Sequence, residues 1–230
     1  MFEIKTNLEV IGLRMTNACA AAGREPASVR LLAVSKTFSA QAVAQAYAAG
    51  QSDFGENYIQ EGVDKIQALV HLPLVWHCIG PIQSNKTRLV AEHFDWVHSV
   101  DRLKIAQRLS EQRPSTRAPL QVCIQVNIDG GPTKAGVPPE QAAELARQIA
   151  RLPGLRLRGI MSIPEPAPDF ASALAVHQRS LALFEALQAQ GFDLDTLSLG
   201  MSADLEAAIQ AGSTLVRVGS AIFGTRSSKA

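Results

Sequence analysis

Short apolar runs alternate with longer segments of helical periodicity along the whole chain. The runs that predict strands are residues 31–35, 52–54, 74–79, 95–98, 120–127, 155–161, 196–199 and 214–218. The segments that predict helices are residues 40–49, 56–69, 102–112, 139–151, 170–190 and 203–211. Strict alternation implies parallel strands, and eight units favour a closed barrel. We therefore expect an α/β fold, a single (β/α)8 TIM-type barrel.

An additional helix is expected before the first strand. Ile4, Leu8, Ile11 and Met15 recur at the spacing of one helix face, which is typical of a helix packed on a core. The alternative architecture is an open doubly wound sheet. No Gly-x-Gly-x-x-Gly follows the first predicted strand, which disfavours a dinucleotide-binding form of that alternative. No linker-like composition divides the sequence, so we expect one domain over residues 1–230.

Charge and cysteine content narrow the class of protein. The sequence has 22 basic and 21 acidic residues, a balance that argues against a nucleic-acid or anionic-membrane partner. The N-terminal segment has no long apolar stretch, so neither a signal peptide nor a membrane span is expected there. Three cysteines without CxxC spacing suit a reducing compartment. We expect a cytoplasmic protein, and a monomer.

The first candidate for chemistry is Lys36, which directly follows the first predicted strand. The carboxyl ends of barrel strands form the functional mouth of the fold. A lysine amine that is partly desolvated there becomes a nucleophile at neutral pH. A lysine just past a strand can equally be a solvated surface residue.

Two small-residue turns near the other end of the sequence are candidates for binding phosphate. Gly200 and Ser202 follow the seventh predicted strand, and Gly219 and Ser220 follow the eighth. Free N–H groups at such turns favour an anion, and barrels often bind phosphate after strands seven and eight. The alternative is structural, with Ser202 as a helix cap and Gly219 as a packing glycine. Because strands one and eight are neighbours in a closed barrel, the amine and the turns would converge, as expected for a phosphorylated aldehyde or ketone held as an imine.

Seven stretches in order carry a resemblance to a known family. They are AVSKT (33–37), FGENYIQE (54–61), WHCIGPIQSNK (76–86), VNI followed by TKAG (126–136), RGIMSIP (158–164), LSLGMSADLEAAIQAG (197–212) and VRVGSAIFG (216–224). On these stretches the chain resembles the YggS/PROSC family of pyridoxal 5′-phosphate (PLP) homeostasis proteins, which is related to the barrel domain of alanine racemase. The resemblance spans nearly the whole sequence.

The resemblance implies a set of cofactor-binding residues. Lys36 matches the lysine that holds PLP as a Schiff base, and Arg217 matches the arginine that faces the pyridine nitrogen. The phosphate positions are Ser202, Gly219 and Ser220; positions near the ring are Asn57, His77 and Met161; Lys134 matches a second lysine near the cofactor entrance.

The resemblance also implies storage, buffering or delivery of PLP to apo-enzymes, without robust turnover. Guanidinium only donates hydrogen bonds, so a ring nitrogen that faces Arg217 must stay unprotonated and is a weaker electron sink. In alanine racemase the opposing acid/base is a tyrosine from a second domain, and here we find only Tyr47 and Tyr58, with no such domain expected after the eighth strand. A minimal amino-acid racemase is the alternative, and an aldolase-type barrel that uses Lys36 on a sugar phosphate is a third possibility.

A metal site is not expected. No zinc-ligand spacing connects the five histidines, which are His71, His77, His93, His98 and His177.

Overall fold

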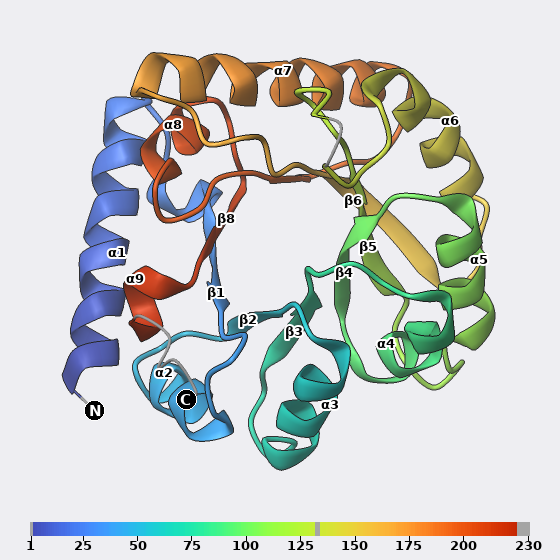
Figure 1. Cartoon of the computed structure of the whole chain (residues 1–230), viewed down its shortest axis with the longest axis horizontal. Helices are drawn as coiled ribbons and strands as arrows, with labels where there is room; N and C mark the ends of the chain where they lie inside the picture. Colours follow the sequence, from blue (N-terminus) through green and yellow to red (C-terminus); the bar gives the residue numbers. More distant parts are fainter. Residues whose placement is uncertain (1, 132–133, 225–230) are drawn as a thin grey trace.

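Eight parallel strands close into a barrel in the computed structural model, which describes residues 2–131 and 134–224. The strands pair in sequence order, and β8 returns to pair with β1 (Figure 1). Their bounds are β1 Arg30–Val34, β2 Asp53–Glu56, β3 Val75–Cys78, β4 Trp96–Val100, β5 Leu120–Gln125, β6 Leu155–Met161, β7 Thr196–Ser198 and β8 Leu215–Val218. The predicted (β/α)8 barrel is therefore confirmed, and the open doubly wound sheet is wrong.

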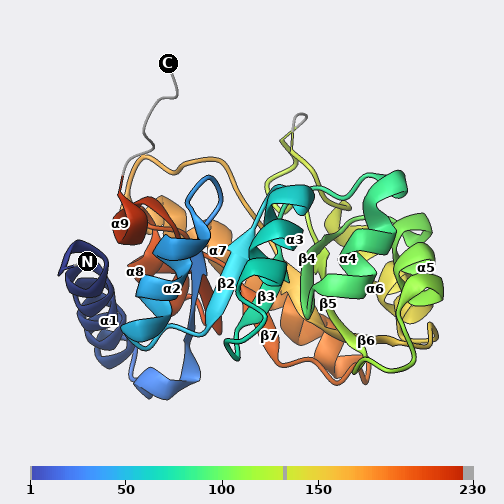
Figure 2. The same ribbon diagram turned by 90° about the horizontal axis from the view of Figure 1, so that it is seen from below.

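Helices surround the barrel (Figures 1 and 2). Their bounds are α1 Phe2–Ala21, α2 Ala40–Ala48, α3 Ile59–Ala68, α4 Thr87–His93, α5 Leu103–Gln112, α6 Pro139–Ile149, α7 Phe170–Ala189, α8 Leu205–Gln210 and α9 Ser220–Phe223, with 3-10 turns at Pro26–Ser28 and Ser84–Lys86. The main core lies between these helices and the outer face of the sheet, where Phe54, Phe94 and Leu109 are fully buried. None of the helices in the described part of the chain combines the length and apolar character that a bilayer crossing requires.

The helix expected at the N-terminus is confirmed as α1. Ile11 and Met15 are buried in the core, and Ile4 and Leu8 pack against it. The helix lies along α8 and α9, beside the place where β8 meets β1 (Figures 1 and 2). It therefore supports the two elements that follow the candidate phosphate turns.

Two predicted boundaries are wrong at the mouth of the barrel. The helix expected from residue 56 begins at Ile59, because Glu56 still pairs with Cys78 in the sheet. The strand expected over residues 120–127 ends at Gln125, because Val126 leaves the sheet to bridge with Val137.

Candidate functional site

A cavity of about 390 Å³ opens at the carboxyl ends of the strands. Its lining residues are Val34, Lys36, Phe38, Asn57, Ile79, Ile163, Met201, Ser202, Ala203, Arg217, Gly219, Ser220 and Gly224. Val34 ends β1, while Asn57 and Ile79 directly follow β2 and β3. The cavity therefore occupies the face of the barrel on which loops carry function, and its volume falls in the range of small-molecule sites.

Lys36 lies in a turn whose backbone is held on both sides. The next residue, Thr37, has φ of 69°, a conformation that costs a β-branched residue of the order of 1–3 kcal/mol. The Thr37 N–H donates to Glu61 Oε1 at 2.6 Å, and the Ser35 carbonyl accepts from Lys65 Nζ at 2.7 Å. Helix α3 thus grips the residues before and after Lys36.

The groups that make these contacts belong to a buried cluster of charged side chains. Lys65 is 5% exposed, and its Nζ also donates to Glu56 Oε1 at 2.7 Å and Glu61 Oε1 at 2.6 Å. Burial raises the pKa of Glu56, although the Lys65 ammonium and the Ser35 hydroxyl act in the opposite direction. We refer to Glu56, Glu61 and Lys65 as the α3 clamp. Sequence reasoning missed it, and the signal that could have found it was the Glu61–Lys65 spacing of four residues on one helix face.

The turn after β7 depends on Gly200. Its φ is +86°, and a Cβ built on it would lie 2.4 Å from the Ala208 Cβ in α8. Its carbonyl accepts the Arg217 N–H at 3.0 Å, which ties this turn to β8. The tie brings Ser202 beside Gly219 and Ser220 on the cavity wall.

Asn57 reaches the cavity through a close backbone approach. A Cβ on Gly80 would lie 2.2 Å from the Asn57 carbonyl oxygen, so only glycine allows the loops after β2 and β3 to pack this tightly. Asn57 is half-buried and lines the cavity wall.

Arg217 is 4% exposed at the floor of the cavity. Its Nη1 donates to the carbonyl and to the hydroxyl of Ser198, both at 2.7 Å, and its Nη2 donates to the Ser162 carbonyl at 2.9 Å. Burial lowers the pKa of Arg217 to about 10, against an opposing effect of Asp204, so the group is still a cation at neutral pH. The acceptors named here are all neutral oxygens, whereas a structural role would favour a carboxylate partner.

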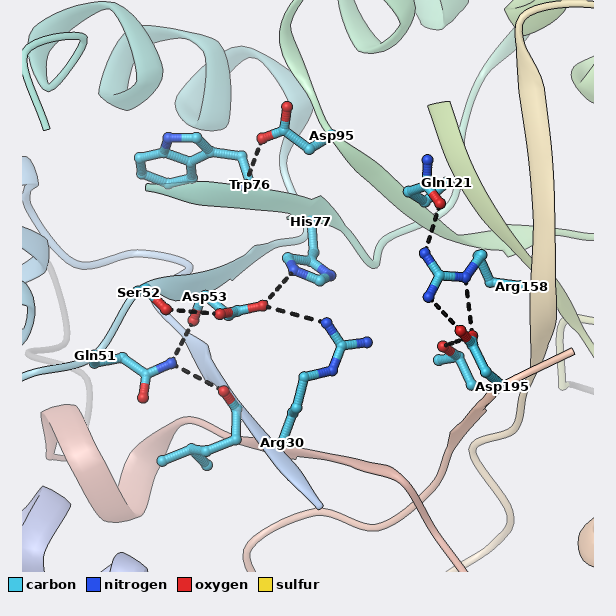
Figure 3. A network of polar contacts seen from close by, with 12 residues as sticks. Arg30, Gln51, Ser52, Asp53, Trp76, His77, Asp95, Gln121, Arg158 and Asp195 are labelled. Carbon is cyan, nitrogen blue, oxygen red and sulfur yellow. Dashed lines mark hydrogen bonds and ion pairs between the residues drawn. The ribbon is translucent and has the colours of Figure 1, made fainter. Parts of the chain in front are cut away.

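His77 and Met161 lie outside the cavity lining. The His77 ring stacks on Trp96 with centroids 5.4 Å apart, and it hydrogen-bonds to Asp53 at the opposite end of the barrel (Figure 3). Met161 is fully buried with Trp96 and Cys123, in a cluster against which Ile163 packs. Of the residues predicted near the ring, the structure brings only Asn57 to the cavity wall, and the cofactor roles of the other two stay predictions.

Lys134 is also outside the cavity lining. Its Nζ lies 3.3 Å from Glu165 Oε1, in the loop that follows β6. The Glu165 N–H in turn donates to Asp129 at 2.6 Å, so the loops that follow β5 and β6 contact one another. The role of Lys134 at an entrance stays a prediction.

The cavity combines three chemical capacities. Lys36 supplies an amine, the turns at Ser202 and Ser220 supply hydrogen-bond donors, and Arg217 supplies a buried cation that only donates. An aldehyde, a phosphate and a basic ring nitrogen fit these three groups. In the described part of the chain, no cluster of three or more His, Cys, Asp or Glu side chains could hold a metal ion.

Comparison with known proteins identifies the family. The family model described as the N-terminal domain of alanine racemase matches residues 14–227. The pyridoxal phosphate homeostasis protein of Pseudomonas aeruginosa is 57% identical over 226 residues, which are 98% of this chain and 97% of that protein. The protein of the same name from Escherichia coli K12 is 51% identical over 229 residues, which are 98% of each chain. The chain belongs to the family of pyridoxal phosphate homeostasis proteins.

Solved structures agree with this assignment. PipY of Synechococcus elongatus, solved with PLP bound, superposes with a TM-score of 0.80 at 37% identity, covering 91% of this chain and 100% of PipY. An alanine racemase of Clostridium difficile superposes with a TM-score of 0.77 at 16% identity, covering 100% of this chain and 58% of the racemase. The second likeness is one of fold, and it confirms the expected relation to the racemase barrel.

Proposed function

We propose that this protein binds PLP at the mouth of the barrel and serves PLP homeostasis by storing, buffering or delivering the cofactor. The observation that carries the proposal is the convergence of Lys36, Arg217 and the two turns on one cavity. The cofactor bound to PipY and the names of the curated relatives support it.

Each group of the cavity has a distinct part in binding. The Lys36 amine would hold the aldehyde carbon as a Schiff base, and Ser202, Gly219 and Ser220, which line the same cavity, would hold the phosphate. Arg217 would donate to the ring nitrogen, which would then stay unprotonated. When bound, PLP supplies an electrophilic carbon and an electron sink, and the unprotonated nitrogen weakens that sink.

The same cavity favours holding over turnover. Among the described lining residues, Lys36 and Arg217 are the only ionisable side chains. Tyr58 is 54% exposed and does not belong to the lining. Racemisation needs a second acid/base opposite the lysine, so we propose that the protein is not an enzyme. Solvent deuterium at the α-carbon of any amino acid, in a broad panel incubated with the PLP-loaded protein, would favour a minimal racemase instead.

The remaining parts of the proposal concern the cellular setting. We propose a cytoplasmic monomer whose partners, besides PLP, are apo PLP-dependent enzymes. Delivery requires an open site, and the cavity reaches the surface at Met201, which is 41% exposed. Cofactor transfer to an added apo-enzyme, measured as recovered activity, tests this part.

Reduction with borohydride tests the mode of binding. The purified protein should be yellow, lose this colour on reduction, and then carry the cofactor mass on the peptide that contains Lys36. Lys36→Ala should abolish the reducible chromophore and weaken PLP binding by about 10- to 100-fold, while phosphate and ring contacts retain residual binding. Absorbance titration and peptide mass spectrometry measure both effects.

Lys104→Ala is the matched control, because Lys104 is an exposed lysine on α5. It should bind PLP like the unaltered protein. A label on another lysine, or a reducible chromophore that survives Lys36→Ala, contradicts the proposed Schiff base. A colourless protein trapped by borohydride only with an added sugar phosphate would favour an aldolase.

A further inference from the structure

Polar side chains cross the interior of the barrel, where apolar packing is the usual arrangement. Asp53 is the first residue of β2, and its Oδ1 lies 3.2 Å from His77 Nε2. His77 Nδ1 lies 2.9 Å from His98 Nε2, and His98 Nδ1 lies 3.0 Å from Ser198 Oγ. Ser198 Oγ accepts from Arg217 Nη1 at 2.7 Å. We refer to these five residues as the interior chain.

The interior chain connects the two ends of the barrel. Strands β4 and β7 are not neighbours in the sheet, so the contact between His98 and Ser198 crosses the interior. One end of the interior chain lies at the amino ends of the strands. Figure 3 shows this end, where one oxygen of the Asp53 carboxylate contacts both the His77 ring and Arg30. At the other end of the interior chain, Arg217 forms part of the cavity wall.

The two end groups, Asp53 and Arg217, fix the direction of every hydrogen bond between them. Guanidinium can only donate and an ionised carboxylate can only accept. His77 Nε2–H must therefore donate to Asp53, which leaves Nδ1 of a neutral His77 as an acceptor. His98 Nε2–H then donates to His77, and the Ser198 hydroxyl donates to His98 Nδ1. This arrangement leaves the Ser198 oxygen free to accept from Arg217, as the geometry requires.

We propose that His98 and His77 are positioning residues for Arg217: through Ser198 they fix the orientation in which the guanidinium donates to the cofactor ring. The inference rests on the proposed function, because it assigns Arg217 to the ring nitrogen. The contacts to Ser198 and Ser162 occupy three of the five N–H donors within the described residues. These contacts hold the guanidinium in place, and its remaining N–H groups can donate to a molecule bound in the cavity.

Electrostatics support the neutral state that this arrangement needs. Burial lowers the pKa of His77, although the hydrogen bond to Asp53 opposes it. Burial lowers the pKa of His98 well below its ordinary value, and the neighbouring His77, Arg217 and Arg30 act in the same direction. A protonated His98 would direct an N–H at Ser198 Oγ, which already accepts from Arg217.

Two measurements test the proposal. Long-range 1H–15N spectra of the protein without PLP should report both rings as neutral and protonated at Nε2 alone. In PLP titrations, His98→Leu should weaken binding by about tenfold, since it leaves the Ser198 hydroxyl proton and His77 Nδ1 without their hydrogen-bond partner. His98→Gln, whose amide both donates and accepts, should recover part of that affinity.

A double-mutant cycle separates positioning from general damage. In an Arg217→Met background, His98→Leu should cause no further loss of PLP affinity, because the residue it orients is gone. Val122→Ala, a core truncation on the outer face of β5, controls for lost stability and should leave affinity unchanged.

The proposal is overturned if His98 carries its proton on Nδ1, if either ring is charged at neutral pH, or if the His98→Leu loss persists undiminished without Arg217. The spectra are recorded on the unaltered protein without PLP, so this result does not depend on cofactor binding or on the folding of a variant. Failure of the unaltered protein to bind PLP would instead overturn the proposed function, leaving the spectra to decide on the interior chain.

Discussion

Thr37 adopts a backbone conformation that its side chain disfavours, directly beside the lysine on which the proposed chemistry depends. Strain of this kind persists only where the surroundings over-determine it. Here the α3 clamp supplies that constraint, since Glu61 accepts from the Thr37 N–H while Lys65 donates to the Ser35 carbonyl. The position of Lys36 is therefore set by residues that never reach the cavity.

Glu61→Gln tests the clamp. The amide retains an oxygen that can accept, but the buried Lys65 ammonium then lacks one of its two counter-charges. We expect the free energy of unfolding to fall by about 1–2 kcal/mol, with weaker PLP binding, measured by urea denaturation and absorbance titration. Glu92→Gln removes a similar i,i+4 pair with Arg88 on an exposed surface and should change stability by less than about 0.5 kcal/mol. Equal effects of the two changes would contradict the role of the clamp.

Single residues of the site could be predicted where a sequence stretch defines both the strand end and the turn. The structure brings six of them to the cavity wall, and their roles toward the cofactor stay predictions: Lys36, Asn57, Ser202, Arg217, Gly219 and Ser220. His77, in contrast, does not belong to the cavity lining. Its strand leads to the mouth, but its ring contacts Asp53, Trp96 and His98 on the neighbouring strands β2 and β4, and no sequence spacing indicates these contacts.

Helix α1 contributes to the site at the level of elements. Arg14 donates to the Ser202 carbonyl at 3.1 Å and to both carboxylate oxygens of Glu206, at 2.8 and 2.9 Å. Shortly after the end of α1, Arg24 donates to the Ile209 carbonyl near the carboxyl end of α8, at 2.7 Å. Arg14 therefore holds the Ser202 turn, which precedes α8, and Arg24 holds the carboxyl end of α8.

Arg14→Ala and Arg24→Ala form a matched pair. Arg14→Ala should release the Ser202 turn and weaken PLP binding by about threefold, a modest effect because this ion pair is partly exposed. Arg24→Ala should leave PLP affinity unchanged even where it lowers the melting temperature. Titration with PLP and thermal unfolding of both variants measure the difference. A larger loss of affinity in Arg24→Ala would contradict the role of Arg14 at the Ser202 turn.

Elements were predictable where they were long and periodic. The segment over residues 83–86 offered only polar residues, and it forms a 3-10 turn that leads into the seven-residue helix α4. A helix of two turns gives too few apolar repeats for a clear period. Strand ends at the mouth were misjudged for a different reason. Glu56 is charged but still pairs in the sheet, and Val126 is apolar but has already left it, so residue type does not mark where these strands end.

At the scale of the whole molecule, the barrel encloses polar groups that separate strands supply. His77 and His98 have no informative spacing in the sequence, and only closure of the sheet joins them to Ser198 and Arg217. Their enclosure has a thermodynamic consequence. Both rings have lowered pKa values in the folded protein, chiefly through burial, so the unfolded chain takes up protons near pH 6.5 that the folded chain does not.

Stability should therefore fall as the pH is lowered from about 7.5 to 5.5, by up to about 1.4 kcal/mol per pH unit for each buried ring. The raised pKa of Glu56 acts with the opposite sign, because the folded chain then binds the extra proton. Burial raises the pKa of Asp53, but His77, Ser52 and Arg30 together lower it below its ordinary value, so this group matters only below about pH 4. Urea unfolding at three pH values, compared with His98→Leu, isolates the histidine contribution: the variant should lose part of the slope. Val122→Ala should keep the slope and be less stable by the same amount at every pH. If His98→Leu behaves like Val122→Ala, then His98 is not held neutral in the folded barrel, and the proposed hydrogen-bond order of the interior chain is overturned.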